Sequence, residues 1–133
     1  MEHPERPDNF TGIWINRHGT NARTEQHYVN GIANGPYRSI LENGVVNREG
    51  CKRDGLWHAT LIVRNSRGEV LDTSEFVNGT GVFRIFNSAG QMTDEVPLVH
   101  GKPHGVVRCW RLGKLVTTRY HEHGVCNAAL GEA

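Results

Sequence analysis

Short runs of apolar and polar residues alternate along this chain, and Gly-containing turns separate them. Residues 56–63 (Leu-Trp-His-Ala-Thr-Leu-Ile-Val) form a strand-like run, the turn Asn-Ser-Arg-Gly follows at 65–68, and residues 69–77 form a second run. The run at 82–86 is followed in the same way by Asn-Ser-Ala-Gly at 87–90. No apolar run has the helical period of about 3.6 residues. The pattern therefore predicts β-hairpins with glycine at the positive-φ position of the turn.

Glycines recur at regular intervals in two parallel series. The first series follows the hairpin tips in steps of 25, 24, 22 and 23 residues: Gly19, Gly44, Gly68, Gly90 and Gly113. The second series is offset from the first by 11 or 12 residues: Gly31, Gly55, Gly79, Gly101 and Gly124. A repeated supersecondary unit is the ordinary source of such a period. We count five units of about 23 residues.

A single hairpin cannot bury its own apolar face, so the stack of hairpins must be the folding unit. The expected fold is all-β, with about five successive hairpins in one elongated, twisted antiparallel sheet. The sheet should cover residues 10–124, between a flexible N-terminal segment at 1–9 and a C-terminal tail at 125–133. Trp57 opens the most hydrophobic hairpin and is expected to be largely buried.

Side chains alternate across a strand, so the residue after the apolar residue that opens each unit should face away from the apolar layer. The five residues at this position are Ile15, Arg38, His58, Arg84 and Arg108. They predict a basic column on one face of the sheet. An ordinary solvated face is the alternative, because an antiparallel sheet of this kind needs one polar face in any case.

Charge is balanced overall but uneven along the chain. The 15 Lys and Arg residues against 14 Asp and Glu give a net charge of +1, which disfavours a general nucleic-acid coat. Residues 96–121 contain five basic residues and no acid, whereas residues 69–95 contain five acids and one arginine. Such blocks suit docking to one partner protein with a complementary pattern.

The segment around Trp110 combines an aromatic residue with neighbouring arginines, and both residue types dominate binding hot spots. The predicted partner-binding residues are Arg84, Arg108, Trp110, Arg111, Arg38 and His58. We expect docking over the fourth and fifth units, and we expect reversal of the charges of Arg84 and Arg108 to weaken binding without unfolding the protein. A place for Trp110 in the core is the alternative.

Two segments could carry chemistry. On a strand, His121 and His123 would point to the same side and could contact one metal ion, but a structural zinc site needs four ligands. The preferred interpretation is a polar cap on the last repeat. Cys109 lies beside Arg108, which could lower the pKa of a thiol, but a buried and inert thiol is preferred. With no nucleophile or phosphate-binding motif, we expect no enzyme activity and no cofactor.

The termini and the cysteines indicate a compartment. The N-terminal residues lack the apolar core of a signal peptide, and no apolar run approaches the roughly 20 residues of a membrane helix. Cys51, Cys109 and Cys126 are odd in number and widely spaced, which favours reduced thiols. These features predict a cytoplasmic protein that does not insert into membranes.

Three phrases resemble MORN-type repeats: Phe-Val-Asn-Gly at 76–79, Gly-Lys-Pro-His-Gly at 101–105, and Leu-Gly-Lys-Leu at 112–115. The resemblance covers residues 10–124, is strongest in the last three units, and gives His104 a role in a turn. Val107 departs from it by replacing the opening aromatic residue, and the paired tyrosines of the pattern are missing.

As a short chain filled almost entirely by these repeats, this protein is similar to bacterial MORN-like antitoxin and immunity proteins. This resemblance implies a non-enzymatic protein that neutralises a cognate secreted toxin by direct binding. We expect this protein to be a monomer or a weak dimer. The alternative is a MORN-type scaffold that binds anionic lipid headgroups or nucleic acid through a basic face.

Overall fold

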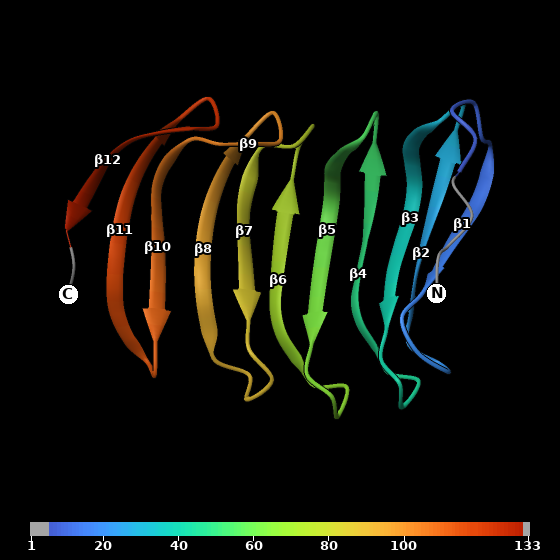
Figure 1. The fold of residues 1–133 in the computed structure, drawn as a ribbon, viewed down its shortest axis with the longest axis horizontal. Helices are drawn as coiled ribbons and strands as arrows, with labels where there is room; N and C mark the ends of the chain where they lie inside the picture. Colours follow the sequence, from blue (N-terminus) through green and yellow to red (C-terminus); the bar gives the residue numbers. More distant parts are fainter. Residues whose placement is uncertain (1–5, 132–133) are drawn as a thin grey trace.

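The computed structural model describes residues 6–131, which form one curved layer of strands (Figure 1). The strands in chain order are β1 (Gly12–Arg17), β2 (Arg23–Val29), β3 (Ile32–Ile40), β4 (Val46–Arg53), β5 (Leu56–Arg64), β6 (Val70–Phe76), β7 (Gly81–Phe86), β8 (Met92–Val99), β9 (Lys102–Pro103), β10 (Gly105–Arg111), β11 (Lys114–Glu122) and β12 (Val125–Gly131). The all-β prediction is confirmed. Residues 6–131 contain no helix, and so none that could cross a membrane.

Almost every strand pairs antiparallel with the next strand in the sequence, as the prediction of successive hairpins requires. One sheet has the order β1-β2-β3-β4-β5-β6, and the other has the order β7-β8-β10-β11-β12, with β9 paired to β8. The expected single ladder is therefore interrupted once, between β6 and β7. Within the described residues, the only backbone bridge between these two strands is that of Val77 with Thr80, beside their turn.

The two glycine series lie in turns at opposite edges of the layer. At the edge of the second series, each turn contains two residues with positive φ, for example Asn78 (47°) and Gly79 (81°). This is the geometry of the type I′ turn, whose twist matches that of the flanking strands. At the other edge Gly44, Gly68, Gly90 and Gly113 also have positive φ, but Gly19 does not.

Backbone hydrogen bonds connect the turns of the second series to one another. Each glycine N–H donates to a carbonyl oxygen roughly one unit earlier, from Gly31 to Phe10 (2.8 Å) through Gly79 to Trp57 (2.7 Å) and Gly101 to Gly79 (3.0 Å). The residue before each glycine donates to a side chain of the preceding unit. These acceptors are Thr11, Asn34, His58, Thr80 and His104. We call this arrangement the turn ladder. It continues past the break between β6 and β7, so it joins the two sheets.

Replacement of Gly79 by alanine should destabilise the fold more than the same change at Gly113. Both residues have positive φ, and a Cβ atom costs about 1–2 kcal/mol in that region. At Gly79 the added Cβ would also lie 2.6 Å from the Gly101 nitrogen, inside the turn ladder, whereas at Gly113 nothing lies within 4 Å. We expect Gly79→Ala to lose about twice as much free energy of unfolding in urea as Gly113→Ala. Equal losses would contradict a stabilising role of the turn ladder.

Among the described residues, three of the four buried apolar side chains cluster beside the break in the sheet, and the fourth, Ile40, lies on β3. Leu61, Val63 and Phe76 are buried on β5 and β6, and the hydroxyl residue Ser74 is buried with them. Trp57 is half-buried, less accessible than the exposed positions but not sealed off from water. The reason is architectural, because a single layer of strands has no second layer to cover its apolar face.

The expected end of the repeat domain at residue 124 is wrong, and residues 1–5 of the expected N-terminal segment lie outside the described residues. Residues 125–131 form β12, which pairs with β11, because another paired strand satisfies the polar groups along that edge. At the other end, residues 6–9 pack on the sheet: the Arg6 guanidinium carbon lies 3.8 Å from the centre of the Tyr28 ring, and the Asp8 carbonyl occupies the space above Gly31.

Candidate binding face

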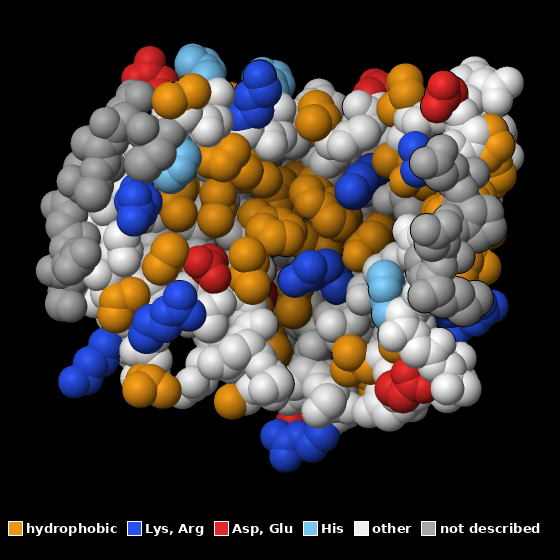
Figure 2. All heavy atoms as spheres, viewed as in Figure 1, with side chains coloured by type: hydrophobic (Ala, Val, Ile, Leu, Met, Phe, Trp, Pro, Cys, Tyr) orange, Lys and Arg blue, Asp and Glu red, His pale blue; other side chains and the backbone are white. Residues whose placement is uncertain are grey.

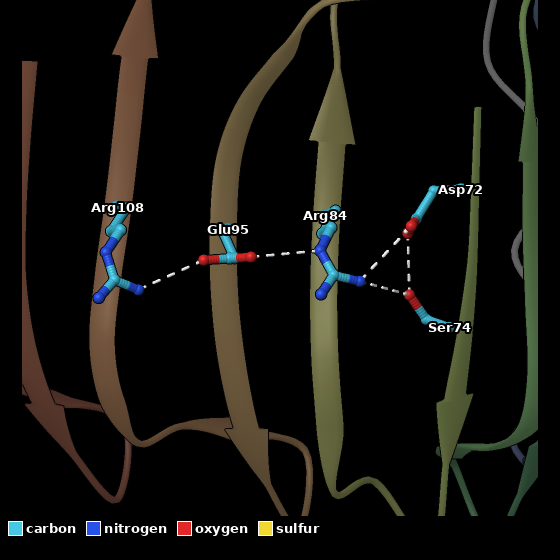
Figure 3. Close-up of polar contacts among 5 residues, drawn as sticks. All are labelled: Asp72, Ser74, Arg84, Glu95 and Arg108. Carbon is cyan, nitrogen blue, oxygen red and sulfur yellow. Dashed lines mark hydrogen bonds and ion pairs between the residues drawn. The ribbon is translucent and has the colours of Figure 1, made fainter. Parts of the chain in front are cut away.

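One face of the layer carries a row of alternating charges. In the second sheet, Arg84 on β7 lies opposite Glu95 on β8, which lies opposite Arg108 on β10. The Arg84 Nε donates to Glu95 Oε2 at 3.2 Å, and the Arg108 Nη1 donates to the other oxygen at 3.3 Å (Figure 3). The two guanidinium groups therefore share one carboxylate.

Arg84 also crosses the break between the sheets. Its Nη1 lies 3.5 Å from Asp72 Oδ1 and 3.2 Å from Ser74 Oγ, both on β6 (Figure 3). Ser74 in turn donates to Asp72 at 2.9 Å. Because β6 and β7 share almost no backbone hydrogen bonds, these side-chain contacts replace part of the missing ladder.

The same alternation appears in the first sheet. Arg38 lies between Glu25 and Glu49 in register, and its Nε donates to Glu25 at 3.1 Å. The pKa of Glu25 is lowered, first by the hydrogen bond from Arg23 and then by that from Arg38. Glu49 accepts from Arg64 at 2.7 Å. We call these residues and their counterparts in the second sheet the charged row: Glu25, Arg38, Glu49, Arg84, Glu95 and Arg108.

The expected basic column is therefore wrong in its charge. The arginines do share a face, but the return strands contribute carboxylates at the same register, so the row is alternating. His58 is also displaced from it. His58 lies opposite Cys51, two residues along β4 from Glu49, and Ile62 lies opposite Glu49 because β5 bulges at Ala59, where φ is 66°. His58 instead accepts a hydrogen bond from the Asn78 N–H at 3.1 Å, in the turn ladder.

The other two predicted binding residues lie near the end of β10. Trp110 is half-buried and Arg111 is exposed. Neither forms an ion pair or a ring contact with any residue between 6 and 131. The structure thus leaves them next to the charged row without bringing them into it.

The structure also places the two segments that were considered for chemistry, Cys109 and the pair His121 and His123. The pKa of Cys109 is raised, first by burial and then by its hydrogen bond to Asp94 (Sγ to Oδ1, 3.1 Å). These effects outweigh the positive charges of the nearby Arg111 and Arg119, which lower the pKa of the thiol. Arg108 points to Glu95 on the opposite face. A thiolate activated by Arg108 is therefore wrong, because the two side chains leave β10 on different sides.

The expected common side for His121 and His123 is also wrong. His123 lies in the turn with a φ of 49°, so strand alternation does not apply to it. Its ring packs 4.9 Å from the ring of His104, and its N–H donates to His104 Nδ1. His104 itself joins β9 to β10, and through this contact it supports the turn at His123. No metal-ligand cluster occurs among the described side chains, and the Cys126 side chain lies outside them.

The face opposite the charged row is aromatic. The rings of Tyr37 and Trp57 meet edge to face with centroids 5.3 Å apart, and Phe83 stacks on Trp57 at 6.3 Å. These contacts join β3, β5 and β7 across the break between the sheets. Figure 2 shows hydrophobic side chains gathered in the middle of this face, with Lys and Arg at their margin. We call the three rings, with Arg48 and Lys52 of β4, the aromatic face.

The two cations of this face have no counter-charge among the described residues. The Lys52 Nζ lies 4.8 Å from the centre of the Trp57 ring and 5.6 Å from that of Tyr37, and burial lowers its pKa. The Arg48 guanidinium lies 5.3 Å over Phe83, and its Nε is buried without an acceptor. This differs from the charged row, where carboxylates accompany the arginines.

Two hollows border these cations. One, of about 290 Å³, is lined by Lys52, Trp57 and Phe83 together with Gly55, Leu56, Leu98 and Gly101. The second, of about 250 Å³, contains Arg48 and Asn47, and the Asn47 Oδ1 there is buried without a donor. Sequence reasoning missed this site because it followed the opening strand of each unit. The sequence of β4 did contain a signal for this site, because Arg48, Gly50 and Lys52 are each two residues apart and so share one face of the strand.

Comparison with protein-family models and with curated proteins found no match to this chain. Its likeness to MORN-type repeats therefore remains a resemblance in sequence phrases, and its function has to be argued from the two faces of the sheet.

Proposed function

We propose that this chain is a non-enzymatic binding protein that docks another protein on its aromatic face. Following the MORN-like resemblance, we propose that the partner is a toxin that this chain neutralises in the cytoplasm. The observation that carries the proposal is the state of Lys52. Its amine is partly removed from water and has no carboxylate partner among the described residues.

Burial of a cation costs free energy unless an opposite charge or a set of acceptors replaces its water. The rings of Tyr37 and Trp57 recover part of that cost through cation–π attraction. A side chain such as Met would fill the same space at lower cost. A carboxylate of a partner protein could form an ion pair with the Lys52 amine, which would explain why a charged residue occupies this position.

The surroundings of Lys52 have the composition of a binding hot spot. Trp, Tyr and Arg are the residue types most enriched at such sites, and hollows that accept partner side chains accompany them. On the charged row, by contrast, the arginines already have acceptors within the fold. The alternative of an anionic lipid or nucleic-acid ligand rested on that row, and its matched acids remove the net positive potential that the alternative requires.

The proposal is tested by co-expressing this chain with the proteins encoded beside its gene. We expect one neighbour to stop growth when expressed alone, and to form a one-to-one complex with this chain that restores growth. Lys52→Met should weaken the complex by about 2 kcal/mol, or roughly thirty-fold in Kd. Its free energy of unfolding in urea should stay equal or rise, because a dehydrated charge is removed.

Lys114→Met is the matched control, since Lys114 is exposed and the charge change is the same. Equal affinities for the Lys52 and Lys114 variants would remove the aromatic face from the interface. Loss of binding in Arg84→Gln or Arg108→Gln with the fold retained would place the interface on the charged row. The absence of any toxic neighbour would contradict the toxin-neutralising function.

A further inference from the structure

The two unpaired cations of the aromatic face are held at a fixed spacing by one strand. Between Arg48 and Lys52, β4 keeps a regular register with β3, from Ser39 opposite Arg48 to Gly35 opposite Lys52. The bulge at this level lies in β5. Both side chains therefore leave the same side of β4, four residues apart, which corresponds to roughly 13 Å at a rise of about 3.3 Å per residue.

The surface between the two cations is apolar, and it requires glycine. A Cβ atom on Gly50 would lie 2.9 Å from Trp57 Cζ3 and 2.9 Å from Leu61 Cδ1, so these side chains close over the strand. Phe83 stacks on the far side of Trp57 and also contacts Arg48. Along β4 the face consequently presents a cation, an aromatic surface and a second cation.

Both cations lack a carboxylate among residues 6–131, and each borders a hollow. Charge complementarity therefore specifies what a docked segment must carry. It needs one carboxylate for Lys52, another for Arg48, and a large apolar side chain between them to cover the aromatic rings. In an extended chain the residues i, i+2 and i+4 share one side and span about 13 Å, which matches this spacing.

We infer, on the basis of the proposed function, that the partner is recognised through an extended acidic–apolar–acidic segment, with two carboxylates four residues apart and a large apolar side chain midway. The segment lies along β4, with its carboxylates at Arg48 and Lys52 and its apolar side chain on Trp57 and Phe83. The inference extends the proposed function from a docking face to the chemistry of the partner.

The probe is the peptide Thr-Asp-Thr-Phe-Thr-Asp-Thr, blocked at both ends, titrated into the full chain labelled for amide NMR. The shuffled peptide Thr-Asp-Asp-Thr-Phe-Thr-Thr has the same composition but not the spacing. We expect the first peptide to shift amide signals of β4, β5 and β7, and to bind at least about tenfold more tightly than the shuffled one. Lys52→Met and Arg48→Met should each weaken it by about tenfold, and Lys114→Met and Arg111→Met should not.

Equal affinities for the two peptides would overturn the inference. So would an equal loss of affinity in the variants of Lys52 and Arg48 and in the control variants of Lys114 and Arg111. Tighter binding of a helical peptide with its acids eight residues apart would overturn the extended conformation. Vesicles of phosphatidylcholine with and without phosphatidylserine supply the competing case: binding that requires phosphatidylserine, Lys52 and Arg48 together would assign the face to a membrane. If both peptides fail while Lys52→Met still disrupts the complex with the toxic neighbour, only this inference fails and the proposed function stands.

Discussion

Replacement of Phe76 by alanine should remove about 3–5 kcal/mol of the free energy of unfolding, the loss typical of a buried aromatic side chain. Phe76 is 2% exposed, and its ring lies 6.5 Å from that of Trp57. A Cβ on Gly81 would meet the Phe76 ring at 2.6 Å, so the ring also packs against the start of β7. It therefore fills the space where the hydrogen-bonded ladder is interrupted.

For a domain with a total stability of about 5–15 kcal/mol, this loss leaves little margin. Urea denaturation of the wild type and the variant gives the difference directly. Val77→Ala is the matched control, because Val77 is the next residue in the chain and is 65% exposed. If the two variants lost the same free energy, the break between β6 and β7 would not be held by apolar packing.

Reversal of both Arg84 and Arg108 to glutamate should cost about 3 kcal/mol of stability. The change would place two new carboxylates beside Asp72 and Glu95, which now accept from these arginines, and it would also remove the link between β6 and β7. The sequence alone leads to the opposite expectation for the fold, because it treats these arginines as exposed and unpaired.

The matched control is the double variant Arg111→Glu with Lys114→Glu, which has the same change in net charge on exposed residues without ion pairs in the described structure. Added salt should restore part of the loss in the first double variant, because it screens repulsion between like charges. Thermal melts at low and high salt measure this. Equal melting temperatures for the two double variants would show that the charged row does not stabilise the break.

The glycine spacing shows what the sequence predicts well. The turn at Asn78-Gly79 depends on two φ angles, and a residue's preference for positive φ is a local property that needs no knowledge of the rest of the chain. The period of the glycines therefore located the turns at both edges and, with them, the order of the hairpins.

Register across strands could not be inferred locally. His58 lies opposite Cys51, outside the row of arginines, and the bulge at the left-handed Ala59 places Ile62 opposite Glu49. The alternation of apolar and polar residues in β5 does not predict that bulge. The carboxylates of Glu25, Glu49 and Glu95 come from return strands, so their approach to the arginines depends on the register between paired strands. A basic column predicted from one strand of each unit became an alternating row once the other strand was in place.

The sequence by itself determined an all-β array of hairpins with turns at fixed intervals, because turn conformation and strand alternation are properties of neighbouring residues. The tertiary structure alone decided where the array is interrupted, which charges are neutralised, and which cations remain unpaired. Arg48 and Lys52 became a candidate site only when Trp57 and Phe83, from other strands, closed around them and removed part of their water. Desolvation and charge pairing depend on groups distant in sequence, so they appear only in the folded chain.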